Sequence, residues 1–194
     1  MISVSELQTE HLELRPFGPE DLDYIIGVHE QSAATVFDDV DSFASTEDFR
    51  GYINALMAHN ATGWTVRHAP TESAVGVLYF VDILQGVTAN FHPVIDRTAL
   101  KDIEPKDALG QRVRIMDEAL RVAAPYMVER FQLQRLGGAF GAHNVPALRL
   151  CDRLGFRREG VIRNGLRIQS APVDLIIYGL TAQEVRSWTV SVPA

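Results

Sequence analysis

Residues 133–163 follow a strand–helix–strand pattern, which constrains the fold more than any other part of the sequence. An apolar strand pattern at 133–140 precedes a helical pattern at 146–154 and a second strand pattern at 158–163. Asn144 is a favourable residue for the start of the helix, and Gly155 is a favourable residue just beyond its end. A unit of this kind favours helices layered on a sheet.

The rest of the chain supplies more strands and helices. Strand patterns cover residues 11–17, 64–69, 74–82, 87–94 and 173–180, and helices are predicted to start near residues 18 and 45 and to end near residue 130. Short turn-like connectors predict that the three middle strands form an antiparallel meander. We therefore expect one α/β (α+β) domain over residues 1–194. Its mixed, mostly antiparallel sheet should have about seven strands, with helices on both faces.

Charge is distributed unevenly along the chain, whose net charge is −7. Residues 1–60 contain twelve acidic side chains against only Arg15 and Arg50, whereas residues 101–170 contain thirteen basic and eight acidic ones. An anionic ligand would prefer the second region and a cationic ligand the first, although both regions could simply be solvated faces. The overall negative charge argues against nucleic-acid binding.

Several classes of protein are disfavoured by the composition. No apolar run approaches the roughly 18 residues of a membrane span, and the first residues lack the pattern of a signal peptide. Cys151 is the only cysteine, so no internal disulfide is possible and a reducing, cytoplasmic location is expected. The six histidines are scattered, and no metal site is expected.

The second half of the sequence resembles the GNAT N-acetyltransferases, in particular their ribosomal-protein N-terminal acetyltransferase branch. The similar stretches are FQLQRLGGAFGAHNVPALRLCDRLGFRREGVIRN and APVDLIIYGL, while the first half matches only in the order of its elements. The resemblance implies acetyl-CoA as acyl donor. It places Asn144 beside the pantetheine arm of the donor and Phe91 among the cofactor-binding residues. Helix capping alone would also explain Asn144, and the two roles are compatible.

The sequence departs from the family at the turn that binds the CoA pyrophosphate. The family has a glycine-rich turn there, whose backbone N–H groups and helix dipole hold the phosphates. Counting back from Arg135 without gaps places this turn at residues 111–116, where the glycines are missing and apolar residues recur at helical spacing. Either Arg112 and Arg114 hold the phosphates through their side chains, or the CoA site is damaged and the domain has another role.

Candidates for proton transfer are few. Family members often place a serine or tyrosine on the helix that follows Asn144, where this chain has Ala147 and Cys151. Cys151 could protonate the leaving thiolate, or it could be a small packing residue. His92, on the strand beside which the acetyl group would lie, is a candidate catalytic residue because histidine can change protonation near neutral pH. It could equally be an ordinary histidine at the end of a strand.

These observations predict an N-acetyltransferase acting on a primary amine of a protein N-terminus, a peptide or a small molecule. Asp38, Asp39 and Asp41 form an acidic segment that would attract the cationic form of the acceptor. The alternative is a non-catalytic domain of the same fold that binds a ligand or a protein. A homodimer is possible because many relatives dimerise. If a donor binds, the strands at 87–94 and 133–140 should diverge near His92 and Gly138.

Overall fold

The computed structural model describes residues 3–33, 46–59, 61–103, 108–168 and 171–188. In chain order the elements are β1 (Leu7–Gln8), β2 (Leu12–Pro16), η1 (Pro19–Asp21), α1 (Leu22–Ala33), α2 (Thr46–His59), β3 (Ala61–His68), β4 (Ser73–Leu84), β5 (Thr88–Ile95), α3 (Ala99–Asp102), α4 (Ala108–Arg130), β6 (Arg135–Gly141), α5 (Val145–Leu154), β7 (Arg157–Ile168), β8 (Ala171–Thr181) and α6 (Ala182–Arg186). The predicted order is present, with short β1, α3 and α6 in addition.

One mixed sheet organises the described residues, with strand order β1-β2-β3-β4-β5-β6-β8-β7. It has eight strands where about seven were predicted, because the two-residue β1 pairs with β2. A strand this short is too brief for an alternating pattern to reveal. The predicted antiparallel meander is confirmed as β3, β4 and β5. The only parallel pair in the described sheet joins β5 to β6.

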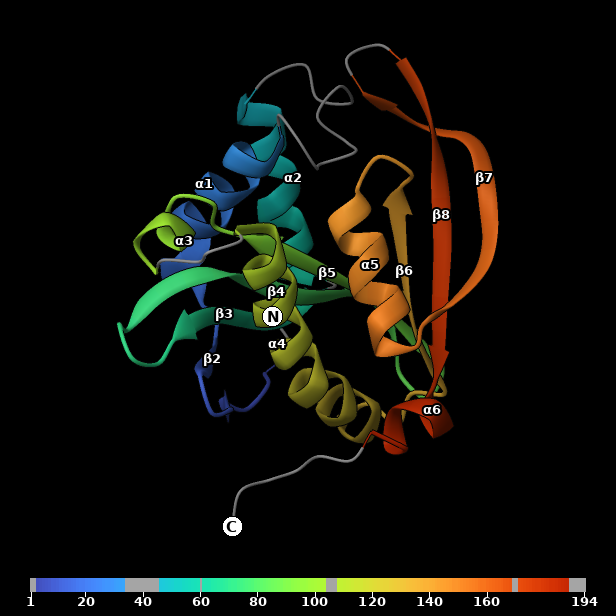
Figure 1. The fold of residues 1–194 in the computed structure, drawn as a ribbon, viewed down its shortest axis with the longest axis horizontal. Helices are drawn as coiled ribbons and strands as arrows, with labels where there is room; N and C mark the ends of the chain where they lie inside the picture. Colours follow the sequence, from blue (N-terminus) through green and yellow to red (C-terminus); the bar gives the residue numbers. More distant parts are fainter. Residues whose placement is uncertain (1–2, 34–45, 60, 104–107, 169–170, 189–194) are drawn as a thin grey trace.

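Helices cover both faces of the sheet, as predicted (Figure 1). On one face, α4, α5 and α6 share a large core with the sheet, which includes the fully buried Trp64 and Phe80. On the other face, α1 and α2 share a smaller core with β3, β4 and β5, built around residues such as Ile26 and Tyr79. The alternation of side chains along each strand supplies both cores, since successive residues point to opposite faces.

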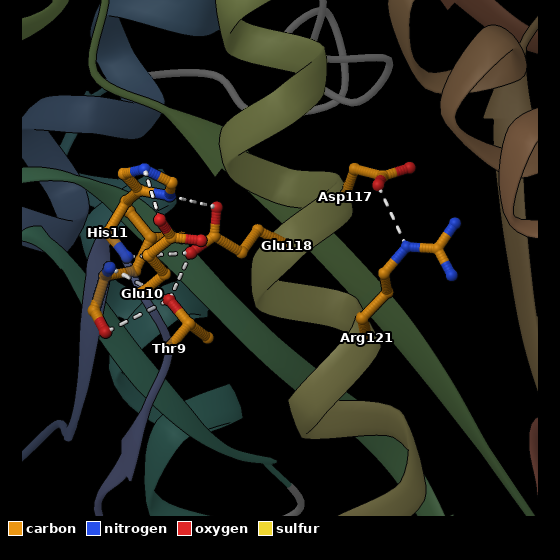
Figure 2. A network of polar contacts seen from close by, with 7 residues as sticks. Thr9, Glu10, His11, Asp117, Glu118 and Arg121 are labelled. Carbon is orange, nitrogen blue, oxygen red and sulfur yellow. Dashed lines mark hydrogen bonds and ion pairs between the residues drawn. The ribbon is translucent and has the colours of Figure 1, made fainter. Parts of the chain in front are cut away.

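Polar contacts fix α4 at both sides (Figure 2). Its Glu118 carboxylate accepts hydrogen bonds from the Thr9 hydroxyl and, at 3.0 Å, from the His11 backbone N–H, which ties the β1–β2 turn to the helix. The neighbouring Asp117 accepts from Arg121 Nε at 3.0 Å and from Arg153 Nη2 at 3.2 Å. Because Arg153 belongs to α5, Asp117 joins the two helices that lie against the centre of the sheet.

The boundaries of α5 follow from its end residues. The Asn144 side chain accepts a hydrogen bond from the Ala147 backbone N–H at 3.2 Å, so the predicted N-cap is present. At the other end Gly155 adopts a left-handed conformation with φ of 81°, and the Phe156 N–H donates to the Cys151 carbonyl at 2.9 Å. Glycine suits this position because a side chain would strain the left-handed backbone.

Within the described ranges, every helix is too short or too polar to cross a lipid bilayer.

Candidate active site

The pairing between β5 and β6 ends abruptly. It covers only Thr88 to Asn90 on β5 and Arg135 to Gly137 on β6. Beyond these residues β5 stays paired with β4 as far as Ile95, and β6 stays paired with β8 as far as Gly141. The two halves of the sheet therefore diverge after Asn90 and Gly137, and the predicted divergence near His92 and Gly138 is confirmed.

The divergence exposes the backbone carbonyl of Phe91 toward β6. The Val87 carbonyl accepts hydrogen bonds from the first residues before and within β6, whereas the Asp96 N–H donates to Val75 at the β4 edge. Backbone groups alternate in direction along a strand. The N–H and C=O groups of odd-numbered residues of β5 therefore point toward β6, and those of even-numbered residues point toward β4. The N–H of Phe91 thus faces the Gly137 carbonyl at the last rung of the ladder, whereas its C=O points toward β6 beyond that rung.

The Phe91 side chain points out of the plane of the sheet and is buried in the core beneath α4 and α5. Its ring centroid lies 5.5 Å from that of Phe140 and 4.9 Å from that of Phe156. A Cβ at Gly138 would lie 2.7 Å from Phe140 and 3.0 Å from Phe91. Gly138 is therefore needed for aromatic packing. The pairing of β6 with β8 is continuous in register through this glycine, so it does not mark a bulge.

Asn144 lies just after β6 and is buried, with 7% of its surface exposed. Its Oδ1 atom is engaged in capping α5. Among the described residues no partner accepts a hydrogen bond from its Nδ2 group, which can therefore donate to a ligand. The structure thus allows the capping and cofactor roles to coexist on one side chain.

His92 is half-buried on the face of β5 that also carries Asn90. Its imidazole stacks on the Tyr79 ring, with centroids 5.2 Å apart and planes 9° apart. Removal from water lowers the pKa of His92 from 6.5 to about 4, although the Asp82 carboxylate acts in the opposite direction. The imidazole is consequently neutral at physiological pH, and its unprotonated nitrogen can accept a hydrogen bond. No described residue hydrogen-bonds to its ring nitrogens.

A buried histidine lies behind this stack. His29 on α1 is fully buried, and its Nδ1 lies 2.7 Å from the Ile25 carbonyl. Because a carbonyl only accepts, Nδ1 carries the hydrogen, and Nε2 accepts from the Tyr79 hydroxyl at 2.9 Å. Burial lowers the pKa of His29 to about 4, which keeps this tautomer neutral.

His29 and Tyr79 are site residues that the sequence did not identify. They are 50 positions apart, and no local motif links them. One signal was present, since His29 falls on the same helix face as Leu22, Ile25 and Ile26. A polar side chain on an apolar face indicates a buried hydrogen-bond partner.

The expected phosphate turn is helical. Residues 111–116 lie inside α4, so the helix continues through the position at which the family has its glycine turn. The Arg114 side chain is exposed to solvent. The backbone of Arg112 belongs to α4, and its side chain is outside the described part of the structure.

Cys151 and the acidic segment are placed as follows. Cys151 is fully buried in the core between α5 and the sheet, and burial raises the pKa of its thiol, with a smaller effect from Asp152. Asp38, Asp39 and Asp41 lie outside the described residues. Of the residues proposed from the sequence, the structure therefore brings Phe91, His92 and Asn144 to the strands and helix at the divergence.

Comparisons with known structures support the same fold. A ribosomal L7/L12 α-N-protein acetyltransferase, RimL, solved with coenzyme A, is 15% identical, with a TM-score of 0.71, over 93% of this chain and 99% of its own. The ribosomal-protein-S5-alanine acetyltransferase of Vibrio fischeri is 18% identical, with a TM-score of 0.69, over 95% and 99%. The spermidine/spermine N-acetyltransferase SpeG of Vibrio cholerae is 16% identical, with a TM-score of 0.67, over 92% and 98%.

Sequence comparison identifies the family. No curated protein sequence matches the chain significantly. The family model described as an acetyltransferase (GNAT) domain matches residues 11–157, which is most of the chain. The matched region contains the strand divergence, His92 and Asn144. The chain therefore belongs to the GNAT acetyltransferase family, whose acyl donor is acetyl-CoA.

Proposed function

We propose that this protein is an N-acetyltransferase that transfers the acetyl group of acetyl-CoA to a primary amine. The observation that carries the proposal is the end of the β5–β6 ladder at Asn90 and Gly137, which leaves the Phe91 carbonyl directed to an open strand edge. Pantetheine is an extended chain containing amide groups. Such a chain can bond to a strand edge as an added strand does.

The residues around the divergence fit the donor. The Phe91 carbonyl can accept a hydrogen bond from a pantetheine amide N–H, and the Asn144 Nδ2 group can donate to a pantetheine carbonyl. The backbone N–H groups of α4 from Arg112 onward are engaged by carbonyls four residues earlier, so they are not available for phosphates. We therefore assign the pyrophosphate to the guanidinium groups of Arg112 and Arg114, one of which makes the main contact because the two side chains point in different directions around α4.

Acetyl-CoA supplies a thioester carbonyl that an unprotonated amine can attack. His92 is neutral at physiological pH because its pKa is lowered to about 4, and it is placed on the strand at which the ladder ends. We assign to it the acceptance of the proton from the amine, directly or through one water molecule. The C–S bond of the thioester then breaks, and CoA leaves as a thiolate that takes up this proton or one from water. For Cys151 we propose a packing role, since its thiol is enclosed in the core.

The acidic residues of the sequence support a cationic acceptor, and its cysteine content supports a cellular compartment. Asp38, Asp39 and Asp41 attract the cationic form of the amine before it loses its proton. The acceptor is a peptide, a protein N-terminus or a small molecule. The single unpaired cysteine supports a reducing, cytoplasmic environment. Relatives named as acting on ribosomal proteins and on spermidine include both protein and small-molecule acceptors.

A specific observation favours a second candidate function. Because α4 runs through the expected phosphate turn, the domain could have lost CoA binding and serve as a non-catalytic binding module. A single experiment distinguishes the two functions. We expect calorimetric titration with acetyl-CoA to give a dissociation constant below about 1 mM and the release of free CoA when an amine is added. Absence of binding at millimolar acetyl-CoA contradicts the first function, and binding without transfer to any amine favours the second.

A further inference from the structure

The face of the sheet that carries α1 and α2 is only partly covered by them. These helices contact β3, β4 and β5. In Figure 1 they lie well apart from β7 and β8. On the same face, the second half of the sheet presents four apolar side chains, which we call the apolar strip: Ala139, Ile162, Leu175 and Ile177. None of them belongs to either core formed by the described residues.

Strand register places the apolar strip on one face. Ala139 on β6 pairs with Ile177 on β8, and Ile162 on β7 pairs with Leu175 on β8. Ile162 is 52% exposed, and the other three side chains are half-buried. Directly paired residues point to the same face. The strip therefore crosses from β6 to the outer edge strand β7, a distance of roughly 10 Å at the usual strand spacing.

This face is also the face of His92. Asn90 and Gly137 are paired, and a Cβ at Gly137 would lie 2.7 Å from Asn90 Oδ1, so both residues share a face. His92 is two residues after Asn90, and Ala139 is two residues after Gly137, so these are the next residues on that face. The apolar strip thus begins directly across the strand divergence from His92.

Charged groups bordering the strip are engaged with one another. The Arg135 guanidinium pairs with the Glu159 carboxylate, and a Cβ at Gly179 would lie within 2.4 Å of both groups, so the pair covers this glycine. On β7, Arg157 pairs with Glu184 at 2.8 Å. Beside His92, the Asp82 carboxylate accepts from Asn90 Nδ2 at 3.2 Å. Within the described residues, the strip itself offers no carboxylate that would hold a second cationic group of an acceptor.

Resting on the acetyltransferase function proposed above, we infer that the apolar strip binds the acceptor. The acceptor is a primary amine that carries an apolar group a few bonds from its nitrogen and no second cationic group. With the amine next to His92, the apolar group lies on Ala139 and Ile177 and reaches Ile162. A polyamine would place an ammonium group on this apolar surface and lose its hydration without gaining a partner.

Ile162 and Val161 provide a matched pair of variants. They are adjacent on β7 and similarly exposed, at 52% and 41%, but Val161 pairs with Ile176 and points to the opposite face. Ile162→Asn should lower kcat/KM for an apolar acceptor about tenfold, in the range of a lost hydrophobic pocket contact. Val161→Asn should leave kcat/KM unchanged. Calorimetry should give the same acetyl-CoA affinity for both variants and the wild type, which verifies that they are folded.

The acceptors are chosen in pairs that separate peptide from small-molecule sources. Leu-Gly-Gly is compared with Gly-Gly-Gly, isopentylamine with ethanolamine, and spermidine is tested alone. We expect at least one apolar member to exceed its polar partner and spermidine about tenfold in kcat/KM. Activity without such a preference, or equal losses in the two asparagine variants, overturns the inference and leaves the acetyltransferase function intact. If acetyl-CoA binds and none of the five amines is acetylated, both proposals fail.

Discussion

The Tyr79 ring stacks on His92 with centroids 5.2 Å apart, and the hydroxyl of the same tyrosine donates to His29 Nε2 at 2.9 Å. One side chain therefore connects the buried face of α1 to the strand at which the sheet divides. The hydrogen bond of the hydroxyl restricts rotation of the Tyr79 ring, and the stacked ring limits the orientations that the His92 imidazole can adopt.

Replacing His92 by glutamine should lower kcat about 100-fold, because general base catalysis contributes roughly 10²–10⁴-fold. Acetyl-CoA affinity should not change. In the wild type, the acid limb of the kcat/KM profile that reports His92 should lie near pH 4, the lowered pKa of this residue, and not near 6.5. Tyr79→Phe is the control, because it retains the stacked ring. A wild-type rate in the glutamine variant excludes His92 as the base.

Stability should depend on pH through His29. Its pKa is lowered from 6.5 to about 4 in the fold, so between these values the unfolded chain binds a proton that the folded chain does not. The free energy of unfolding therefore has its full value above pH 6.5 and decreases as pH falls toward 4, by up to about 1.4 kcal/mol per pH unit. Measured by urea unfolding at several pH values, the free energy of unfolding of His29→Gln should change less with pH between 4 and 6.5 than that of the wild type. An equal change with pH contradicts a neutral buried His29.

Two substitutions at Asn144 separate its roles. Serine can still cap α5, whereas alanine cannot, so Asn144→Ala should lose about 1 kcal/mol of stability and Asn144→Ser much less. Both variants lack the Nδ2 donor. Loss of a hydrogen bond of about 1 kcal/mol should weaken acetyl-CoA binding about fivefold in both, measured by calorimetry. Unchanged affinity in both variants limits Asn144 to capping.

Arg112 and Arg114 should contribute unequally to donor binding. Helical geometry places them about 200° apart around α4, so both cannot point at one phosphate. Charge-assisted hydrogen bonds are worth roughly 1.5–3 kcal/mol, and the loss of one should weaken binding about tenfold or more. We expect this effect for only one of Arg112→Ala and Arg114→Ala, and a smaller effect at moderate salt. Two variants that bind as tightly as the wild type would assign the phosphates to another element.

The acidic segment is tested by replacing Asp38, Asp39 and Asp41 together with asparagine. If these residues attract a cationic acceptor, KM should rise at low salt. The difference from the wild type should shrink at high salt, because exposed charges are screened within about 8 Å at physiological ionic strength. An unchanged KM at low salt assigns these residues to an ordinary solvated surface.

Local patterns were sufficient to predict most of the fold. The start of α5 at Asn144 and its end at Gly155 depend on capping chemistry within a few residues, and the structure has both. The meander of β3, β4 and β5 follows from alternation and short turns. Strand β1 was not predicted, because two residues are too few to show an alternating pattern.

The site was predicted less completely because its parts are distant in sequence. His92 and Asn144 were proposed as site residues from the family pattern, but the Tyr79–His29 hydrogen bond depends on how α1 lies over β4. The apolar strip combines Ile162 from β7 with Ala139 from β6, and their common face is fixed only by the register of both strands with β8. Register between distant strands is a property of the assembled sheet.

The short β5–β6 ladder also affects how the molecule resists force. Among the described residues, only three pairs join the two halves of the sheet. By contrast, β3, β4 and β5 on one side and β6, β8 and β7 on the other are joined by longer antiparallel ladders. Helix α4 contacts β2 and β4 in one half, and β6, α5 and α6 in the other. Mechanical load applied across the sheet would therefore separate it first between β5 and β6, against a resistance that comes mainly from the side chains packed beneath α4.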